Sequence, residues 1–190
     1  MIRGVNIELV PAALEDKQCV YDWCCRSETT KAHSGPPDYP ENPVDTWEKF
    51  FDEGYEDFFF TGAHPEKGRG FIIRHSGEPI GFISYSSFHL KPKHAEIDIW
   101  FYREASCGKG YGSEAIISLG AYLNAHLGIK ELIIRPSKRN ARAIKAYMKA
   151  GFEKSEKSPS EYLLDEYMPL YGTGDYGEGG DLLLCKRFGR

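Results

Sequence analysis

The residues of this chain best suited to chemistry form a glycine-rich turn, Cys107-Gly108-Lys109-Gly110-Tyr111-Gly112, which leads into Ser113. Glycines at alternate positions let the backbone approach a ligand closely and adopt positive φ angles without a steric penalty. The residues that follow have the pattern of a helix, whose first turn presents unpaired N–H groups and a partial positive charge. The turn therefore predicts a binding site for an anion such as a phosphate.

This turn matches neither of the two common phosphate-binding patterns. The Walker sequence requires Gly-Lys-Ser/Thr, whereas the chain has Gly108-Lys109-Gly110. The dinucleotide fingerprint requires Gly-x-Gly-x-x-Gly, whereas the glycines here follow the pattern Gly-x-Gly-x-Gly. Taken alone, the turn could also be an ordinary connection between a strand and a helix.

Two carboxylates and a tyrosine are candidates for proton transfer. Glu96 and Asp98 lie in a segment with the alternation of a β-strand, so their side chains share one face. Tyr147 lies on the apolar face of a predicted helix, seven residues after Asn140. A carboxylate can accept a proton from an attacking group, and a tyrosine can donate one. The same side chains could instead be a solvated sheet face and a core tyrosine.

Strands and helices alternate along the chain and must position these groups. The pattern predicts strands at 6–10, 70–74, 79–88, 94–102, 131–135 and 181–186, with one more from Phe152, and helices at 14–25, 44–53, 140–150 and from the glycine turn to Gly128. On the strand at 94–102, Ile97, Ile99 and Phe101 alternate with Glu96, Asp98 and Trp100. In the last helix, Arg142, Lys145 and Lys149 point away from the apolar face. The proline-rich segment 34–43 and the tail 158–180 are predicted loops.

The composition indicates one folded domain over residues 1–190, because 41% of the residues are hydrophobic and 14% are aromatic. A net charge of −4 argues against a duplex nucleic acid and favours a cationic partner. The sequence has no run of transmembrane length and no leader at Met1, so we expect a cytoplasmic protein that does not bind membranes. Five cysteines without a Cys-x-x-Cys pair predict neither a disulfide framework nor a metal site. His89 and His94 are expected at the surface.

Residues 102–152 resemble the acetyl-coenzyme-A core of the GNAT N-acetyltransferases. The pyrophosphate motif of that family, Arg/Gln-x-x-Gly-x-Gly/Ala, is similar to residues 107–112, although Cys107 replaces the usual Arg or Gln. A later family segment is similar to Asn140-x-x-Ala143-Ile144-x-x-Tyr147-x-Lys149-Ala150-Gly151-Phe152. Within the family, segments 76–82, 97–110 and 136–140 look most like the aminoglycoside 6'-N-acetyltransferases, and 95–97 also resembles the ribosomal-protein N-terminal acetyltransferases.

The resemblance implies an α/β (α+β) GNAT fold, with a mixed, mostly antiparallel sheet flanked by helices on both faces. Its fourth and fifth strands, 94–102 and 131–135, would splay apart to admit the pantetheine arm of the coenzyme. The implied reaction transfers an acetyl group from acetyl-CoA to a primary amine, by direct attack in a ternary complex and without a metal.

The same resemblance assigns roles to particular residues. Asp98 or Glu96 would take the proton of the amine, with Asp98 favoured by similarity to the aminoglycoside enzymes, and Tyr147 would be the acid for the leaving thiolate. Asn140 would bind the pantetheine arm, and a backbone N–H near Trp100 or Phe101 would meet the oxyanion. The residues expected to bind the coenzyme are Trp100, Phe101, Tyr102, Cys107, Gly108, Lys109, Gly110, Tyr111, Gly112, Ser113, Asn140 and Tyr147.

Several alternatives remain open at this stage. The chain could be a CoA-binding sensor or scaffold without activity, or it could use another acyl-CoA. The acceptor could be an aminoglycoside-like polyamine, a small metabolite or a protein amine, and the protein a monomer or a homodimer. Aromatic residues from the least family-like segments are candidate walls of the acceptor pocket: Tyr39, Trp47, Tyr162, Tyr167 and Tyr171.

Overall fold

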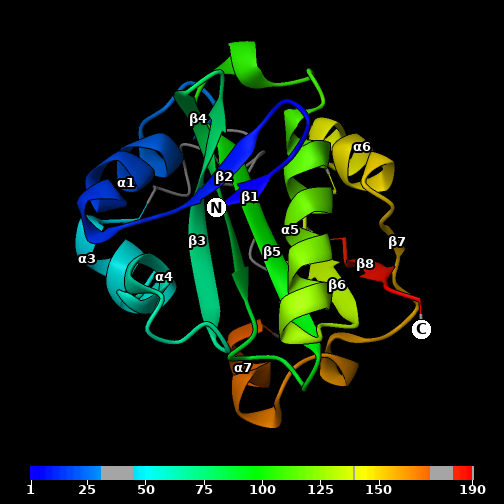
Figure 1. Cartoon of the computed structure of the whole chain (residues 1–190). Coiled ribbons are helices and arrows are strands. Elements are labelled where there is room, and N and C mark those ends of the chain that lie inside the picture. Colours follow the sequence, from blue (N-terminus) through cyan, green and yellow to red (C-terminus); the bar gives the residue numbers. More distant parts are fainter. Residues whose placement is uncertain (31–44, 139, 172–181, 190) are drawn as a thin grey trace.

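The computed structural model describes residues 1–30, 45–138, 140–171 and 182–189, and its centre is a mixed sheet (Figure 1). Its eight strands in the described residues have the order β1-β2-β3-β4-β5-β6-β8-β7. They are β1 (Ile2–Arg3), β2 (Glu8–Pro11), β3 (Gly68–His75), β4 (Glu78–Ser86), β5 (His94–Phe101), β6 (Glu131–Ile134), β7 (Glu153–Lys154) and β8 (Leu184–Arg187). Neighbouring strands are antiparallel except β5 and β6, which confirms the predicted sheet.

The parallel strands β5 and β6 separate soon after they meet. They pair only from His94 with Glu131 to Glu96 with Ile133. Beyond Glu96, β5 still pairs with β4 as far as Phe101, but its other edge opens into a gap before β6. This is the predicted splay, and the two strands are fifth and sixth in order because the structure contains an additional N-terminal strand, β1.

Helices cover both faces of the sheet. The helices are η1 (Leu14–Asp16), α1 (Lys17–Cys25), α3 (Trp47–Lys49), the π-helical η2 (Phe50–Gly54), α4 (Phe58–Thr61), η3 (Glu104–Ser106), α5 (Tyr111–Leu127), α6 (Ala141–Lys149), η4 (Pro159–Glu161), η5 (Asp165–Tyr167) and α7 (Met168–Tyr171). In Figure 1, α1, α3 and α4 lie on one side of the sheet and α5 and α6 on the other. None of the helices in the described ranges is long and apolar enough to cross a membrane.

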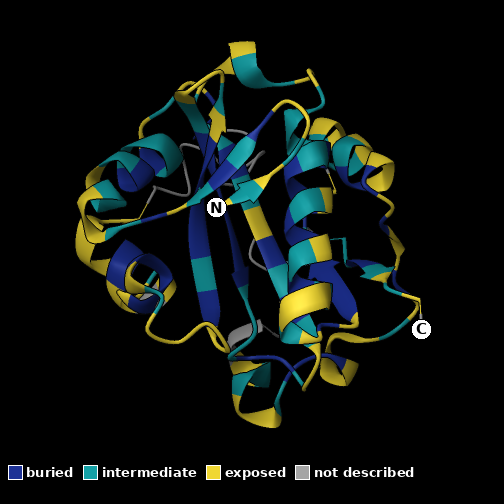
Figure 2. Cartoon of the chain, viewed as in Figure 1, coloured by how far each residue is buried: buried dark blue, intermediate teal, exposed yellow. Residues whose placement is uncertain are grey.

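The alternation of the strands divides the buried side chains into two layers (Figure 2). Ile97 packs with the apolar side of α5, and Ile99 and Phe101 lie against the same cluster. Trp100 points the other way and packs with α1 and the aromatic residues of η2 and α4. The two predicted faces of this strand are therefore confirmed.

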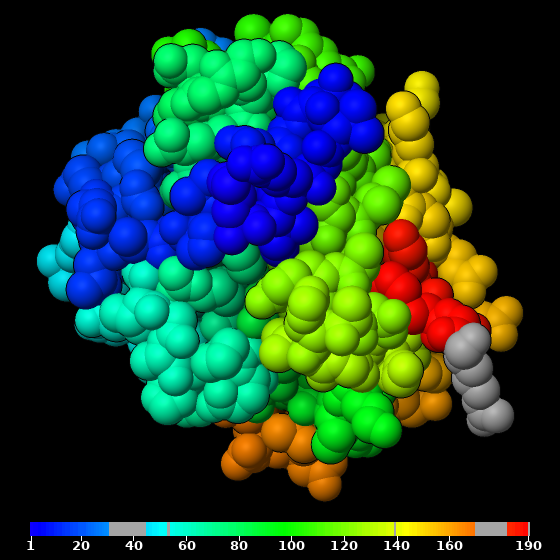
Figure 3. Space-filling view, in the orientation of Figure 1, coloured from blue at the N-terminus to red at the C-terminus, as the bar shows by residue number. Residues whose placement is uncertain are grey.

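The β3–β4 hairpin and the N-terminal strands hold the α5 side in place. Ser76 and Gly77 both have positive φ angles, 52° and 84°, as a two-residue hairpin turn requires. The Glu114 carboxylate on α5 accepts hydrogen bonds from the backbone N–H groups of Asn6, at 2.7 Å, and Ile7, at 3.3 Å. In Figure 3 the N-terminal residues, in blue, lie between the β3–β4 hairpin and α5.

Some predicted elements differ from the structure. The helix expected at 44–53 begins at Trp47, where the Thr46 hydroxyl caps it, and becomes π-helical at Phe50. The short helix α4 was not predicted; it forms because Phe58, Phe59 and Phe60 bury their rings in the aromatic core. The tail at 158–171 contains η4, η5 and α7 rather than loop alone. The loop predicted at 34–43, the tail at 172–180 and Asp181 lie outside the described residues.

A substitution at Gly81 should loosen the strand that carries the site. A Cβ atom there would overlap the Trp100 carbonyl oxygen and lie 3.1 Å from the Cα of Phe101. We expect Gly81→Ala to lower the free energy of unfolding by about 2 kcal/mol, because the clash is with backbone that cannot rotate away. The measurement is urea denaturation. Gly54→Ala is the control, since a Cβ there meets no described atom within 4 Å; equal losses in the two variants would contradict the prediction.

Candidate active site

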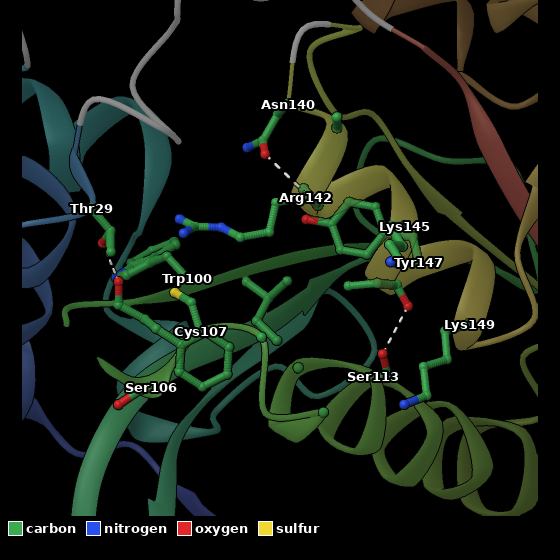
Figure 4. A pocket seen from close by; sticks show the side chains of 18 residues that line it. Thr29, Trp100, Ser106, Cys107, Ser113, Asn140, Arg142, Lys145, Tyr147 and Lys149 are labelled. Atoms are coloured by element: carbon green, nitrogen blue, oxygen red, sulfur yellow. Dashed lines mark hydrogen bonds between the residues drawn. The ribbon is translucent and has the colours of Figure 1, made fainter. Parts of the chain in front are cut away.

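A cavity of about 700 Å³ lies where β5 and β6 separate (Figure 4). One wall is the end of β5, with Ile99, Trp100 and Phe101, and the opposite wall is α6. The glycine turn and the first turn of α5 close one end. The gap in the sheet is therefore large enough to hold a small-molecule ligand.

The glycine turn has the backbone geometry that its sequence predicts. Gly108 and Gly110 have φ angles of 74° and 91°, which side chains other than glycine rarely adopt. A Cβ atom at Gly112 would lie 3.2 Å from the Phe101 ring. Because Gly112 and Ser113 line the cavity, the N-terminal turn of the 17-residue helix α5 opens onto it. This end of the cavity is suited to an anion.

Three basic residues of α6 also line the cavity, and the sequence analysis did not assign them to a site. They are Arg142, Lys145 and Lys149. The prediction that they point away from the apolar face is correct, but the cavity rather than open solvent lies on that side. A row of cations next to a glycine-rich turn is a signal in the sequence that could have indicated a phosphate site. Thr29, in the turn after α1, lines the cavity too and donates its hydroxyl to the Phe101 carbonyl.

Nine of the predicted coenzyme residues line the cavity: Trp100, Phe101, Cys107, Gly108, Gly110, Gly112, Ser113, Asn140 and Tyr147. Three do not line it, and their predicted contact with the coenzyme stays a prediction: Tyr102, Lys109 and Tyr111. The Tyr102 ring stacks on Trp23 with centroids 4.8 Å apart, and its hydroxyl donates to the Pro79 carbonyl at 3.1 Å. The Tyr111 hydroxyl lies 2.9 Å from Nε2 of His75.

The wall formed by α6 is fixed by short polar contacts (Figure 4). Asn140 caps the helix, with its Oδ1 accepting the Ala143 N–H at 3.1 Å. The Ser113 hydroxyl donates to the Ala146 carbonyl at 2.9 Å, which ties α5 to α6. Cys107 also lines the cavity, and burial raises the pKa of its thiol. A protonated thiol is a weak nucleophile, so the geometry gives Cys107 no covalent role.

Asp98 and Tyr147 come from opposite faces of the sheet, and Asp98 is not among the residues that line the cavity. Asp98 is exposed and accepts a hydrogen bond from the Tyr55 hydroxyl, which also lies 3.2 Å from Oγ of Ser84. Tyr147 is buried and lines the cavity. Burial, and then the Asp98 carboxylate, raise the pKa of the Tyr147 hydroxyl, so it keeps its proton at neutral pH. Tyr55, on the chain between η2 and α4, was not predicted as part of the site.

Glu96 shares the face of Asp98 but has different surroundings. Its carboxylate lies 2.7 Å from Nε of Arg135 and 2.7 Å from Nε2 of His89, and its side chain is 13% exposed. Burial alone would raise the pKa of Glu96, but the charge of Arg135 and the contacts with His89 lower it to about 2. His89 is buried, which corrects its predicted surface position, and His94 is partly buried beside Glu131.

The aromatic residues predicted as walls of the acceptor pocket differ in their burial and contacts. Tyr162 is buried and donates its hydroxyl to Glu131 at 3.0 Å, so it is part of the core. Trp47 is 37% exposed and packs edge-on against Tyr21. Tyr39 lies outside the described residues. The described ranges contain no group of three or more His, Cys, Asp and Glu side chains placed to hold a metal ion.

Comparison with known proteins gives a family and a set of similar folds. Residues 6–153 match the model of the acetyltransferase (GNAT) domain. A crystal structure of the aminoglycoside acetyltransferase AAC(6')-Ib with coenzyme A has a TM-score of 0.67 at 20% identity, over 95% of this chain and 94% of that one. Spermidine N-acetyltransferase from Vibrio cholerae, in complex with CoA and spermine, has a TM-score of 0.64 at 15% identity, over 96% of this chain and 95% of that one. No curated protein matches the sequence.

The low pKa of Glu96 should make the free energy of unfolding depend on pH below about pH 4.5. Its pKa in the folded protein, about 2, is below the usual 4.5, so it contributes stability that is complete above about pH 4.5 and is lost as the pH falls towards 2. We expect Glu96→Gln to lower the free energy of unfolding at pH 7 by about 3 kcal/mol, because Arg135 loses a buried partner. The measurement is urea denaturation of both proteins from pH 7 to pH 3.

The difference between the two proteins isolates Glu96, because all other carboxylates titrate in both. It should shrink below pH 4.5, where the wild type loses a stabilisation that the variant does not have. A difference that stays constant down to pH 3 would contradict the assigned ion pair.

Proposed function

The chain belongs to the GNAT family of acetyltransferases, and on that premise we propose that it transfers an acetyl group from acetyl-coenzyme A to a primary amine of a cationic acceptor, by direct attack in a ternary complex. The observation that carries this proposal is the cavity between β5 and α6. The glycine turn at one end of this cavity is suited to an anion. The cavity also contains Tyr147, and the Asp98 carboxylate helps to raise the pKa of its hydroxyl.

The coenzyme fits this cavity in one direction. Its pyrophosphate would lie on the backbone N–H groups of the turn around Gly108 and Gly110, near the cations of α6. Its pantetheine arm contains amides that can pair with the edge of β5, which has a strand partner only as far as Glu96 on that side. The thioester would then lie beside the Tyr147 hydroxyl, whose pKa is raised in part by the Asp98 carboxylate.

Asp98 is the better candidate for the base. It is exposed beside the gap and is oriented by the Tyr55 hydroxyl, so an ammonium group can reach it. Glu96 is mostly buried and is bound to Arg135 and His89, and a carboxylate with a pKa of about 2 is a poor proton acceptor. We therefore give Glu96 a structural role and Asp98 the proton of the amine, which it takes directly or through a water molecule.

The reaction then follows from the two groups. The amine, after losing a proton to Asp98, attacks the thioester carbonyl, and a C–N bond forms while the oxygen becomes an oxyanion. A backbone N–H near Trp100 or Phe101 would stabilise that oxyanion. The nitrogen loses its second proton to water, or to the thiolate through water. When the C–S bond breaks, the Tyr147 hydroxyl supplies a hydrogen bond or a proton to the thiolate. Its raised pKa favours the hydrogen bond, because a thiol is a stronger acid than a buried phenol.

The acceptor class follows from charge. The protein carries a net charge of −4, and the exposed carboxylate of Asp98, the proposed base, would attract an ammonium group. The similar folds include enzymes named for aminoglycosides and spermidine, both of which are polycations. We propose a polyamine of this general type, with small metabolite amines and protein amines as the alternatives. Release of free thiol from acetyl-CoA, followed with aminoglycosides, spermidine and short peptides, tests the proposal. Coenzyme binding without thiol release from any amine would instead favour a non-catalytic CoA-binding protein.

Asp98→Asn should reduce catalysis without affecting the coenzyme. The amide keeps the shape of the side chain but cannot accept the proton, so we expect kcat to fall about 10²- to 10⁴-fold while the Kd for coenzyme A is unchanged. Steady-state kinetics and calorimetry measure the two quantities. Glu78→Gln, an exposed carboxylate at the start of β4, is the control for loss of charge. The role of Asp98 would be refuted by a variant with the kcat of the wild type.

Tyr147→Phe should have a smaller effect. It removes one hydrogen bond to the thiolate and no packing, so we expect kcat to fall about 10- to 100-fold, with little change in the KM of the amine. The fall should be smaller with an acetyl thioester whose leaving thiol is more acidic, because that thiolate needs less help. Equal losses with both donors would contradict a role of the Tyr147 hydroxyl at the leaving thiolate.

A further inference from the structure

One ion pair links α6 to η3, the short helix that precedes the glycine turn. Glu104 belongs to η3, which leads from β5 into the turn, and Arg142 lies in the first turn of α6. The Glu104 carboxylate accepts hydrogen bonds from both terminal nitrogens of the Arg142 guanidinium, and the distance from Nη2 to Oε1 is 3.1 Å. Arg142 itself lines the cavity, and Figure 4 shows its side chain extending towards the side of Cys107 and Trp100. The guanidinium thus lies within the proposed coenzyme site, already paired with a carboxylate.

The surroundings favour a phosphate over this carboxylate. The Arg142 and Glu104 side chains are 46% and 51% exposed, and an ion pair so open to water contributes little to stability. A second carboxylate is close, because the Glu104 N–H donates to Oε2 of Glu28 at 2.9 Å. Two carboxylates near an anion site repel a phosphate, whereas a guanidinium binds one with two parallel hydrogen bonds.

Cations flank the turn at both ends. At one end, the positive charge of Arg142 acts on the Cys107 thiol, where it opposes the rise in pKa that burial causes. At the other, Nζ of Lys149 is 3.9 Å from the position that a Cβ on Gly110 would occupy. Of these two cations, Arg142 is the one that forms an ion pair with Glu104. A change of partner by Arg142 would place a cation at each end of the pyrophosphate.

We propose that Arg142 exchanges Glu104 for the coenzyme pyrophosphate on binding, so that Glu104 competes with the coenzyme and limits its affinity. The inference rests on the proposed function, because it takes coenzyme A as the ligand. Its consequence is that the two members of one ion pair have opposite effects. Arg142 strengthens coenzyme binding, and Glu104 weakens it.

The test is calorimetric titration of coenzyme A, 3'-dephospho-coenzyme A and pantetheine into the wild type and its variants. Glu104→Gln keeps the side-chain shape and frees the guanidinium, so we expect about three- to tenfold tighter binding of the two pyrophosphate ligands. Arg142→Gln should weaken both by about tenfold, and Arg142→Lys by less, because it keeps the charge but loses the fork. Pantetheine, which has no pyrophosphate, should bind all proteins alike.

A matched control separates local from general effects. Glu153→Gln removes the same charge from a comparably exposed pair, Glu153 with Arg187 at 3.7 Å on β7 and β8. It should leave every Kd unchanged. A general effect of net charge would instead tighten binding in Glu153→Gln as much as in Glu104→Gln, and this would overturn the inference.

The other possible results of the titration contradict either the inference or the proposed function. If Glu104→Gln and Arg142→Gln both weaken binding, the pair is only a structural brace, and the inference fails. It fails as well if Glu104→Gln binds like the wild type, or if only coenzyme A responds, which would assign Arg142 to the 3'-phosphate. A wild-type protein that binds no coenzyme A would contradict the proposed function itself, and that result is distinct from all of these.

Discussion

β5 and β6 pair for three residues and then part, and the cavity exists because of that separation. The last pair is Glu96 with Ile133, and Glu96 is also the residue whose carboxylate binds Arg135, just beyond β6, and His89, just beyond β4. This buried ionic contact joins the strands at the point where they diverge. The contact lies where the pairing of β5 and β6 ends, and the cavity extends from the separated strands to the glycine turn. These contacts are the basis of the structural role that we propose for Glu96.

The separation also brings together side chains from opposite faces of the sheet. Asp98 points to the α1 side and Tyr147 comes from α6 on the other, and in a continuous sheet the backbone would stand between them. Across the gap the charge of the Asp98 carboxylate helps to raise the pKa of the Tyr147 hydroxyl. The negative charge for an amine and the cations for a phosphate are likewise divided between the two sides of β5. In the proposed function, this division lets an acidic chain bind a polyanionic coenzyme and a cationic acceptor next to each other.

Local patterns in the sequence were enough for the fold and for one end of the site. The alternation from Ile97 to Phe101 predicts both faces of β5, and the glycines at 108, 110 and 112 predict the anion site, because each depends on neighbouring residues only. Tyr55, Thr29 and Arg135 could not be found in this way, since they reach the site through contacts between distant segments. Arg142 was visible as a polar residue, but only the position of α6 shows that its polar side faces a cavity rather than solvent.

The most direct test of this account is a crystal structure of the protein with coenzyme A bound. The account predicts the pyrophosphate on the backbone N–H groups of residues 108–113, the pantetheine arm along the open edge of β5, and the sulfur beside the Tyr147 hydroxyl on the side of the gap nearest Asp98. Coenzyme bound outside the gap between β5 and α6, or with its sulfur remote from both side chains, would contradict it.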